Sequence, residues 1–325
     1  GHWTKVIAIY PRTELLKDQL AEAYRMARRL DSTLARHGKR KIKIGAFFGS
    51  TPNSVQQPFF SEDWRDTKAG RICPWLRCPN CDADLVWRKQ DFEKRIEQLS
   101  CLQPGCNKVI SSDEVVLTRR SLNDMPPDIL FTTTEMLNQR LSDHWYRGLF
   151  GVGVENHHKP FLALLDEVHT YSGTSGAQAA LVLRRWRHAV DTPITWSGLS
   201  ATLAEAQRFF ADLTGVREDR VEVISPEASE MESEGAEYQI ILQGDAGSRA
   251  SLLSASIQAS MLIARTLDPA DHGCSSGVFG QRLFVFTDDL DVTNRLFDDL
   301  RDAEAYDLFG KRDQKRKPLA ALRSG

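Results

Sequence analysis

The sequence predicts an α/β protein whose parallel sheet carries helices on both faces. Short apolar runs, which predict strands, alternate along the chain with longer segments whose apolar residues recur at helical spacing. Such alternation is typical of a parallel sheet that is covered on both sides. A length of 325 residues is more than one compact core usually holds, so we expect more than one domain.

Apolar runs of strand length recur along the first part of the chain. They are found within residues 6–10, 41–49, 128–143, 160–169 and 193–203. The first run leads into a helix in which Leu15, Leu16 and Leu20 recur at helical spacing. The second run stops at a cluster of turn residues, 50–54, before a cysteine-rich segment. This order predicts five strands of one parallel sheet with helices between them.

Composition predicts where this sheet domain ends. Residues 1–222 hold the five strands, and residues 223–237 are acidic and poor in large apolar side chains, as expected of a linker. Residues 238–325 begin a second α/β unit, with a helix near 252–267, a strand that ends at 287–289 and a further helix. This second unit is too short to form a complete domain of the same kind.

Polar side chains gather where the predicted strands end. In an open parallel sheet, ligands bind outside the carboxyl ends of the strands, so these side chains should share one edge. The residues expected to face phosphate groups are Arg12, Thr13, Thr51, Thr132 and Thr133. We expect them to form a shelf for a sugar-phosphate backbone, with contacts that do not depend on base sequence. Alternatively, the threonines only cap the helices that follow them.

Two adjacent carboxylates, Asp166 and Glu167, end the fourth strand, and His169 follows them. This arrangement is common in the hydrolysis of magnesium nucleotides. An aspartate holds Mg²⁺, often through water, and a glutamate orients the attacking water molecule. A strand-end aspartate that merely caps the next helix is the alternative interpretation, and the pair alone does not exclude it.

The motifs together resemble those of superfamily 2 helicases. Residues 166–169, Asp-Glu-Val-His, resemble the DExH box, and residues 200–202, Ser-Ala-Thr, resemble motif III. Residues 11–19 are similar to motif Ia, 132–137 to motif Ib, and 285–289 to motif IV, which opens the second lobe of these enzymes. The resemblance implies a RecA-like fold, ATP and Mg²⁺ as cofactors, and the start of a second RecA-like lobe.

The segment that follows the box narrows the resemblance. Residues 166–186 are similar to the MrfA-like and Hrq-type DNA helicases, relatives of which occur in anti-phage systems such as DISARM and Druantia. The resemblance implies an ATP-dependent DNA helicase or translocase that acts on single-stranded DNA, possible partner subunits and a defence role. It also implies that Asp166 holds Mg²⁺, Glu167 is the catalytic base, His169 couples the nucleotide to motif III, and Ser200 and Thr202 couple the lobes.

The chain departs from this family in one respect. No Gly-x-x-x-x-Gly-Lys-Ser/Thr phosphate loop is found in the 325 residues. In the family this loop precedes motif Ia, and motifs V and VI follow the second-lobe strand, so we expect them upstream of Gly1 and beyond Gly325. The chain is therefore expected to be an internal piece of a longer helicase, and to bind and hydrolyse ATP poorly alone.

Five of the six cysteines lie between Cys73 and Cys106, which indicates a metal site rather than a disulfide framework. Two pairs separated by nineteen residues have the spacing of zinc knuckles, and the expected Zn²⁺ ligands are Cys78, Cys81, Cys101 and Cys106. Four thiolates close a tetrahedral structural site, so residues 70–112 are predicted to form a zinc ribbon inserted into the sheet domain. Cys73, the fifth cysteine of the segment, is not needed as a ligand. In the alternative interpretation, Cys73 binds the ion in place of Cys78.

Several side chains of this insertion suit a DNA-binding surface. They are Arg71, Trp75, Arg77, Trp87, Arg88 and Lys89. A protein contact or a merely structural insertion is equally open, and the whole chain could instead be a non-catalytic, zinc-stapled module for nucleic acid or a partner. On a later helix, Arg184, Arg185 and Arg187 either pack against neighbours or have a function.

Overall composition sets the remaining limits. The formal net charge is −2, from 42 basic and 44 acidic residues, which excludes a histone-like protein but allows a local basic patch. No run approaches the length of a membrane-spanning helix, so we expect no membrane partner. Clustered cysteines fit a reducing, cytoplasmic setting.

Overall fold

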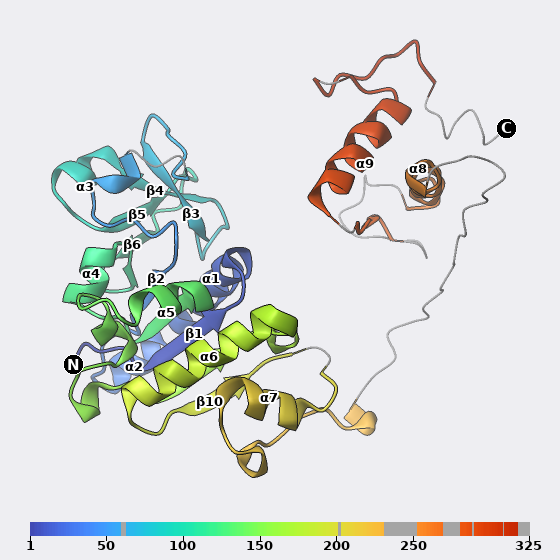
Figure 1. The fold of residues 1–325 in the computed structure, drawn as a ribbon. Helices are drawn as coiled ribbons and strands as arrows, with labels where there is room; N and C mark the ends of the chain where they lie inside the picture. Colours follow the sequence, from blue (N-terminus) through green and yellow to red (C-terminus); the bar gives the residue numbers. More distant parts are fainter. Residues whose placement is uncertain are drawn as a thin grey trace. The chain divides into compact units, whose positions relative to one another are not determined.

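The computed structural model describes residues 1–59, 63–200, 203–230, 252–268, 280–287, 289–307 and 309–317. The chain divides into two compact units, Gly1–Pro226 and Glu227–Gly325, which we describe separately (Figure 1). Thr202, part of the acidic segment 223–237 and Cys274 lie outside the described residues.

The first unit is built on a six-stranded sheet with the order β10-β9-β1-β8-β2-β7. Every pairing in it is parallel. The strands are β1 (Val6–Tyr10), β2 (Ile44–Phe47), β7 (Val115–Val116), β8 (Ile129–Thr133), β9 (Leu162–Leu165) and β10 (Thr195–Gly198). All five predicted strands are present, and the predicted fold class is confirmed.

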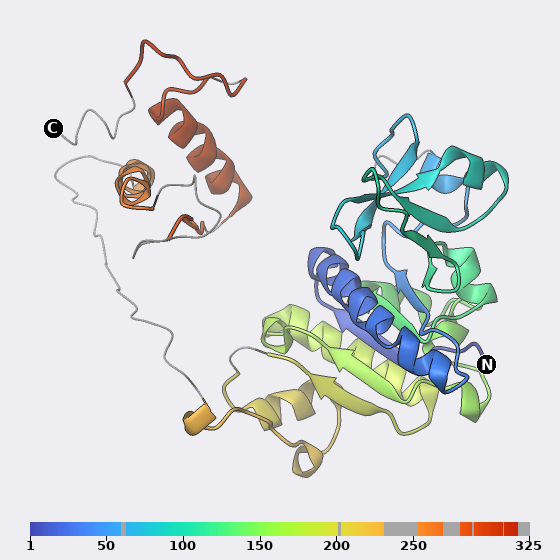
Figure 2. The same cartoon turned by 180° about the vertical axis from the view of Figure 1, so that it is seen from behind.

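Helices cover both faces of this sheet, because successive residues of a strand point to opposite sides. Ala8 and Tyr10 of β1 pack with α1, whereas Ile7 and Ile9 pack with α5 and α6. Figure 1 shows α5 and α6 in front of the sheet, and Figure 2 shows α1 on the opposite face. The helices of this unit are α1 (Thr13–Arg29), α2 (Asp31–Arg36), α3 (Lys89–Glu93), α4 (Arg119–Asp124), α5 (Thr134–Arg140), α6 (Gly173–Val190) and α7 (Ala206–Thr214).

Short 3₁₀ turns link these elements. They are η1 (Gln57–Phe59), η2 (Arg147–Phe150), η3 (Asn156–His158), η4 (Val168–Thr170) and η5 (Glu218–Arg220), while η6 (Ala228–Glu230) lies in the second unit. Among the helices that the structure describes, none combines the length and apolar character needed to cross a membrane.

The cysteine-rich segment between β2 and β7 forms a second, antiparallel sheet with the order β3-β4-β5-β6. Its strands are β3 (Gly70–Arg77), β4 (Asp84–Arg88), β5 (Gln98–Cys101) and β6 (Val109–Ser111). We call this segment, residues 70–111, the ribbon. It packs against α1 and shares one core with it, so it is a continuous part of the first unit.

The ribbon's tryptophans belong to this shared core. Trp75 is 5% exposed and Trp87 is 0% exposed, and both rings pack against Trp64. The prediction that Trp75 and Trp87 offer a DNA-binding surface is therefore wrong. A segment this small buries its large aromatic side chains because they supply most of the apolar area that can hold it to the lobe.

Two buried carboxylates join the ribbon to the rest of the first unit. Glu114 accepts hydrogen bonds from Tyr24 Oη at 2.5 Å and from Lys41 Nζ at 2.5 Å, and a third from Lys108. Burial alone would raise the pKa of Glu114, but the bonds from Lys41, Tyr24 and Lys108 lower it overall. The charge of Glu114 therefore stabilises the folded protein.

Glu97, in the loop before β5, makes the second connection. Its carboxylate accepts hydrogen bonds from the backbone N–H of Leu117 at 3.0 Å and from Thr118 Oγ1 at 2.6 Å. Thr118 is also the N-cap of α4, where its side chain accepts from the N–H of Ser121. Glu97 thus fixes the point where the chain leaves the ribbon and returns to the sheet.

The second unit contains two described helices, α8 (Leu252–Ala264) and α9 (Leu290–Ala303), whose contact buries Ile257, Met261 and Leu296. The strand expected before α9 is absent from described residues 280–287, where Phe284 is 73% exposed and Phe286 is 90% exposed. An apolar run becomes a strand only beside another strand, and the described part of this unit offers none.

Candidate nucleotide and metal sites

The DEVH residues leave the sheet at the carboxyl end of β9, as predicted. The N–H of Asp166 still reaches Ile9 O of β1, at 3.4 Å. Glu167 then has a left-handed backbone with φ 49°, and its N–H donates to Asp166 Oδ1 at 2.9 Å. A glutamate in this conformation is strained, and such strain persists where the surrounding structure fixes it, often at functional sites.

His169 brings the two motifs together. Its Nδ1 lies 3.1 Å from Ser200 Oγ and 3.3 Å from Glu167 Oε2. Backbone bonds hold this contact in place, since the N–H of Val168 donates to Leu199 O at 3.0 Å. Three of the five predicted catalytic residues, Glu167, His169 and Ser200, are therefore in mutual contact range through the imidazole.

Asp166 can accept a cation at this edge. One carboxylate oxygen accepts the N–H of Glu167, and no side-chain donor among the described residues occupies the other. A single carboxylate with several water molecules suits Mg²⁺, which dehydrates reluctantly. The donor set of Asp166 therefore fits the ion.

Two tyrosines beside Asp166 form part of the site but were not among the predicted site residues. Burial, and then the charge of Asp166, raise the pKa of Tyr171 to about 12, and the same causes raise the pKa of Tyr10. Tyr171 Oη lies 3.2 Å from Thr134 Oγ1, at the start of α5. Both hydroxyls stay neutral at physiological pH and add polar groups to the carboxylate's surroundings. The position of Tyr10 at the end of a predicted strand was the sequence feature that could have identified it as a site residue.

The threonines expected to face phosphate have other partners. Thr51 is 2% exposed and donates to Ala46 O at 2.9 Å, while Thr132 is 0% exposed and donates to Phe47 O at 2.8 Å. Thr133 caps α5 by accepting from the N–H of Met136. The expectation that Thr51 and Thr132 present hydroxyls to a ligand is wrong, because buried polar groups pair with nearby backbone.

After the carboxyl end of β1, Arg12 is exposed and Thr13 beside it is half-buried. Arg12 is the N-cap residue of α1, but its side chain makes no cap hydrogen bond. It also makes no ion pair within the described part of the chain. A free guanidinium at a helix N-terminus suits an anionic ligand.

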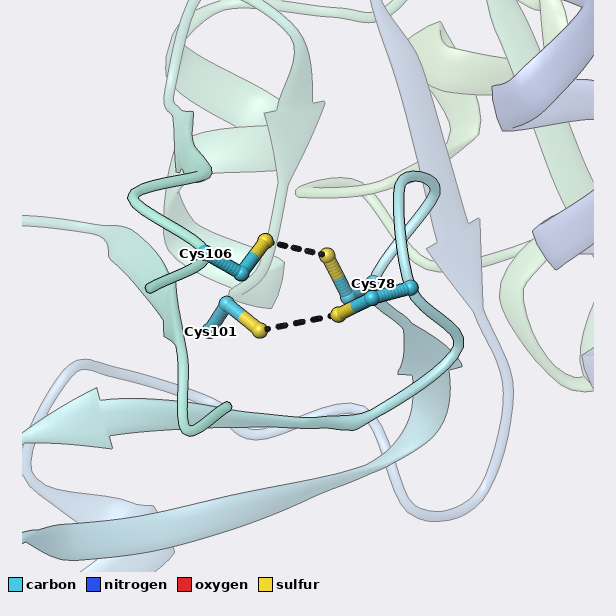
Figure 3. Close-up of side chains that lie close together, drawn as sticks. Cys78, Cys101 and Cys106 are labelled. Atoms are coloured by element: carbon cyan, nitrogen blue, oxygen red, sulfur yellow. Dashed lines mark hydrogen bonds between the residues drawn. The ribbon is translucent and has the colours of Figure 1, made fainter. Parts of the chain in front are cut away.

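The four predicted metal ligands converge in the ribbon, and Figure 3 labels three of them, Cys78, Cys101 and Cys106. The sulfur atoms of Cys78, Cys81, Cys101 and Cys106 all lie within 4.8 Å of one another. The Cys78–Cys106 separation is 3.7 Å and the Cys81–Cys101 separation is 3.4 Å. A tetrahedral site with Zn–S bonds of about 2.3 Å requires sulfur atoms about 3.8 Å apart, so the cluster fits Zn²⁺.

Cys73 lies apart from this cluster. It is 4% exposed within β3, and burial raises the pKa of its thiol to about 12. It is not one of the four residues whose sulfur atoms converge. The alternative in which Cys73 replaces Cys78 is therefore wrong, and Cys73 is an apolar core residue.

Comparison with known proteins supports the helicase resemblance, although no family model matches the chain. The Druantia protein DruE of Escherichia coli (strain UMEA 4076-1) is 25% identical over 251 residues, which are 65% of this chain and 14% of DruE. The Lhr helicase/uracil glycosylase of E. coli K12 is 35% identical over 119 residues, which are 36% of this chain and 7% of that protein.

Two solved structures are similar over part of their length. The Mycobacterium smegmatis helicase Lhr bound to ssDNA and AMP-PNP has 20% identity and a TM-score of 0.39, covering 65% of this chain and 18% of that chain. The DUF1998 helicase MrfA bound to DNA and AMPPNP has 18% identity and a TM-score of 0.35, covering 65% and 19%.

The chain is thus similar in sequence to the Druantia protein DruE over 65% of its length and to Lhr helicases over about a third of its length. Of the proteins named above, the Druantia protein DruE has the longest sequence alignment with this chain, 251 residues. The chain spans about one seventh of the length of DruE.

Proposed function

We propose that this chain supplies the magnesium-binding and water-activating half of an ATP-dependent DNA helicase or translocase. The observation that carries the proposal is the contact of His169 with both Glu167 and Ser200, beside Asp166 at the carboxyl edge of the sheet. Proximity in the sequence does not explain the contact between His169 and Ser200, because the two residues are 31 positions apart. A helix-capping aspartate needs neither partner.

Each residue then has a distinct role. Asp166 holds Mg²⁺, which when bound neutralises charge on the nucleotide phosphates. Glu167 orients the attacking water and accepts its proton, and the contact of its carboxylate with His169 Nδ1 positions it. His169 links that carboxylate to Ser200, so that a change at the nucleotide reaches the segment after β10. Thr202 is proposed to act with Ser200, on the strength of the motif.

The nucleic-acid contact is proposed at the same edge, through Arg12 and Thr13. A guanidinium, a hydroxyl and the N–H groups that begin α1 can all bind backbone phosphate without reading bases. Single-stranded DNA is proposed as the partner because of the subfamily resemblance. A cytoplasmic location, partner subunits and a role in anti-phage defence are proposed on the same ground.

The ribbon is proposed to stabilise the lobe and to do no chemistry. Four thiolate ligands leave no open position on Zn²⁺ for a substrate. Its strands pack on α1, whose first turn carries the proposed phosphate contact. The ion would therefore hold α1 and β3 in their places.

A second candidate function is a non-catalytic module that binds nucleic acid or a partner subunit. It is favoured by one observation, since the 325 residues contain no phosphate loop. The intact Asp-Glu-Val-His segment and its contact with Ser200 favour the catalytic proposal, because a scaffold has no use for them.

ATP turnover distinguishes the two candidates. The measurement uses a protein that joins this chain to a phosphate loop, with and without single-stranded DNA. The catalytic proposal expects turnover that DNA stimulates. DNA binding with no turnover under both conditions would support the non-catalytic module instead.

A further inference from the structure

A hollow lined by arginines lies at the opposite edge of the sheet from Asp166. It has a volume of about 660 Å³ and forms where the ends of α6 and α7 meet the loop that precedes β10. Arg184, Arg187 and Arg220 line it together with His188. Figure 1 shows α7 beside α6 and β10, and α6 runs away from the DEVH segment toward this end.

The three arginines have no carboxylate partner within the described part of the chain. Several other arginines of the first unit are paired, as Arg217 is with Asp219 and Arg77 with Asp84. One carboxylate, Asp191, lines the hollow, but it forms no ion pair with the arginines. Three positive charges against one negative charge leave an excess that an anionic ligand would neutralise.

Two of these guanidinium groups are held in place by the protein. Arg184 donates to Asp212 O and Arg187 donates to Gly215 O, at the end of α7. Gly215 has φ 73°, and a Cβ there would lie 3.1 Å from Arg184 Cγ and 3.3 Å from Arg187 Nη1. The glycine thus lets both side chains close over the helix end. A guanidinium has five N–H donors, so each retains several for a ligand.

The rest of the lining indicates what the ligand is. Thr192, Pro193 and Gly215 complete it, and the imidazole of His188 is the single aromatic ring among the lining residues, with no large aliphatic side chain beside it. An apolar molecule would find little surface on which to pack. Phosphate groups, in contrast, match the paired N–H donors of arginine.

We propose that this arginine hollow binds backbone phosphates of nucleic acid at a second position on the first unit. Arg184 and Arg187 lie 11 and 14 residues beyond Gly173, so they are about 17 to 21 Å along α6 from the end that follows the DEVH segment. A single phosphate group cannot contact both the hollow and the edge that carries Arg12, but different phosphates of one DNA molecule can. The inference rests on the proposed handling of nucleic acid, and it adds a contact remote from Arg12.

Charge reversal at Arg220 tests the proposal. Arg220 is exposed and its side chain makes no hydrogen bond within the described residues, so Arg220→Glu should fold normally. Arg217→Glu is the matched control, because it changes charge equally, three positions away, outside the hollow. Affinity for a long labelled single-stranded DNA is measured by fluorescence anisotropy at several salt concentrations, for the 325-residue chain and both variants.

We expect Arg220→Glu to weaken binding by about 3- to 10-fold more than Arg217→Glu does, and to reduce the salt slope by about 1. Equal affinities and slopes for the two variants would overturn the proposal while leaving the proposed function intact. Failure of the parent chain to bind DNA at all would overturn both. The same measurement with labelled poly-glutamate tests the other kind of anion: weaker poly-glutamate binding by Arg220→Glu, with DNA binding equal to that of Arg217→Glu, would overturn the proposal in favour of an acidic protein partner.

Discussion

The strand edge and the ribbon both contain buried or half-buried acidic groups, but the two regions use them in opposite ways. At the strand edge the side chains of Glu167 and His169 are 36% and 37% exposed, and they contact each other loosely. Where the ribbon joins the rest of the first unit, Glu97 and Glu114 are at most 8% exposed and accept several hydrogen bonds each. Satisfied groups stabilise a fold, whereas groups with spare lone pairs are available to a ligand.

The threonines show that position along a strand does not decide between these roles. Thr51 and Asp166 both follow the carboxyl end of a parallel strand, yet Thr51 turns inward to Ala46 O. A hydroxyl is small enough to be satisfied by one or two backbone groups, whereas a carboxylate at a strand end requires a cation, several donors or water. The carboxylates are therefore the groups that stay open at this edge.

Removal of zinc should have the largest effect. Protein purified without added metal is expected to contain about one equivalent of Zn²⁺, and Cys101→Ser should lose it. Structural zinc contributes about 10 kcal/mol to small domains, so the ribbon should unfold in this variant. Elemental analysis and thermal unfolding check the prediction.

Cys73→Ala is the matched control for zinc removal, because Cys73 is buried in the same sheet but is not a ligand. It should retain the metal. A full equivalent of zinc in Cys101→Ser, a metal-free parent, or a disulfide between Cys81 and Cys101 would each contradict the assignment.

Glu114→Gln should have the next largest effect. Loss of one charge from a buried network costs about 3 kcal/mol, and here Lys41, Lys108 and Tyr24 lose a charged acceptor, because glutamine keeps one acceptor oxygen and places an NH2 donor where the other was. The folded pKa of Glu114 lies below its ordinary value of 4.5, so the stability it provides is complete above that pH and is lost as pH falls through the folded pKa.

Chemical denaturation of parent and Glu114→Gln from pH 7 to pH 3 measures this contribution. The difference in unfolding free energy between the two proteins should be largest near neutral pH and should shrink below about pH 4.5. A difference that stays constant across this range would show that the charge of Glu114 is not responsible.

The threonines should give a smaller effect, confined to stability. Thr51→Val together with Thr132→Val leaves Ala46 O and Phe47 O without these donors, at a cost of about 1 to 3 kcal/mol for each. Affinity for single-stranded DNA should be unchanged in the folded variant, while Arg12→Gln, the comparison variant, should weaken it. A correctly folded double variant with weakened DNA binding would instead support the prediction that these hydroxyls form a shelf for the sugar-phosphate backbone.

Much of this contrast could be predicted from the sequence. The location of Asp166 and Glu167 was predictable because they directly follow an apolar run of strand length. Parallel strands end at a common edge, so residues after such a run lie at that edge. The four zinc ligands were likewise predictable, since each pair is close in sequence and the ion requires four donors.

The rest depends on contacts between distant parts of the chain. Trp75 and Trp87 each lie within two positions of an arginine, Arg77 and Arg88, and it is the packing of the ribbon with α1 and Trp64 that makes them core residues. The partners of Glu114 lie up to 90 positions away, at Tyr24. No local pattern indicates such burial, which is why those groups were assigned to the surface or missed.

The central claim is that Glu167 activates water at the open strand edge, and ATP turnover by Glu167→Gln tests it most directly. In a protein that joins this chain to a phosphate loop, we expect turnover to fall by about 10²-fold or more while ATP affinity stays within a few-fold, because the shape is kept and the base is lost. Glu205→Gln is the matched control, since Glu205 is an exposed glutamate with the same φ of 49°, and it should retain turnover. Turnover of Glu167→Gln within a few-fold of the parent would contradict the account.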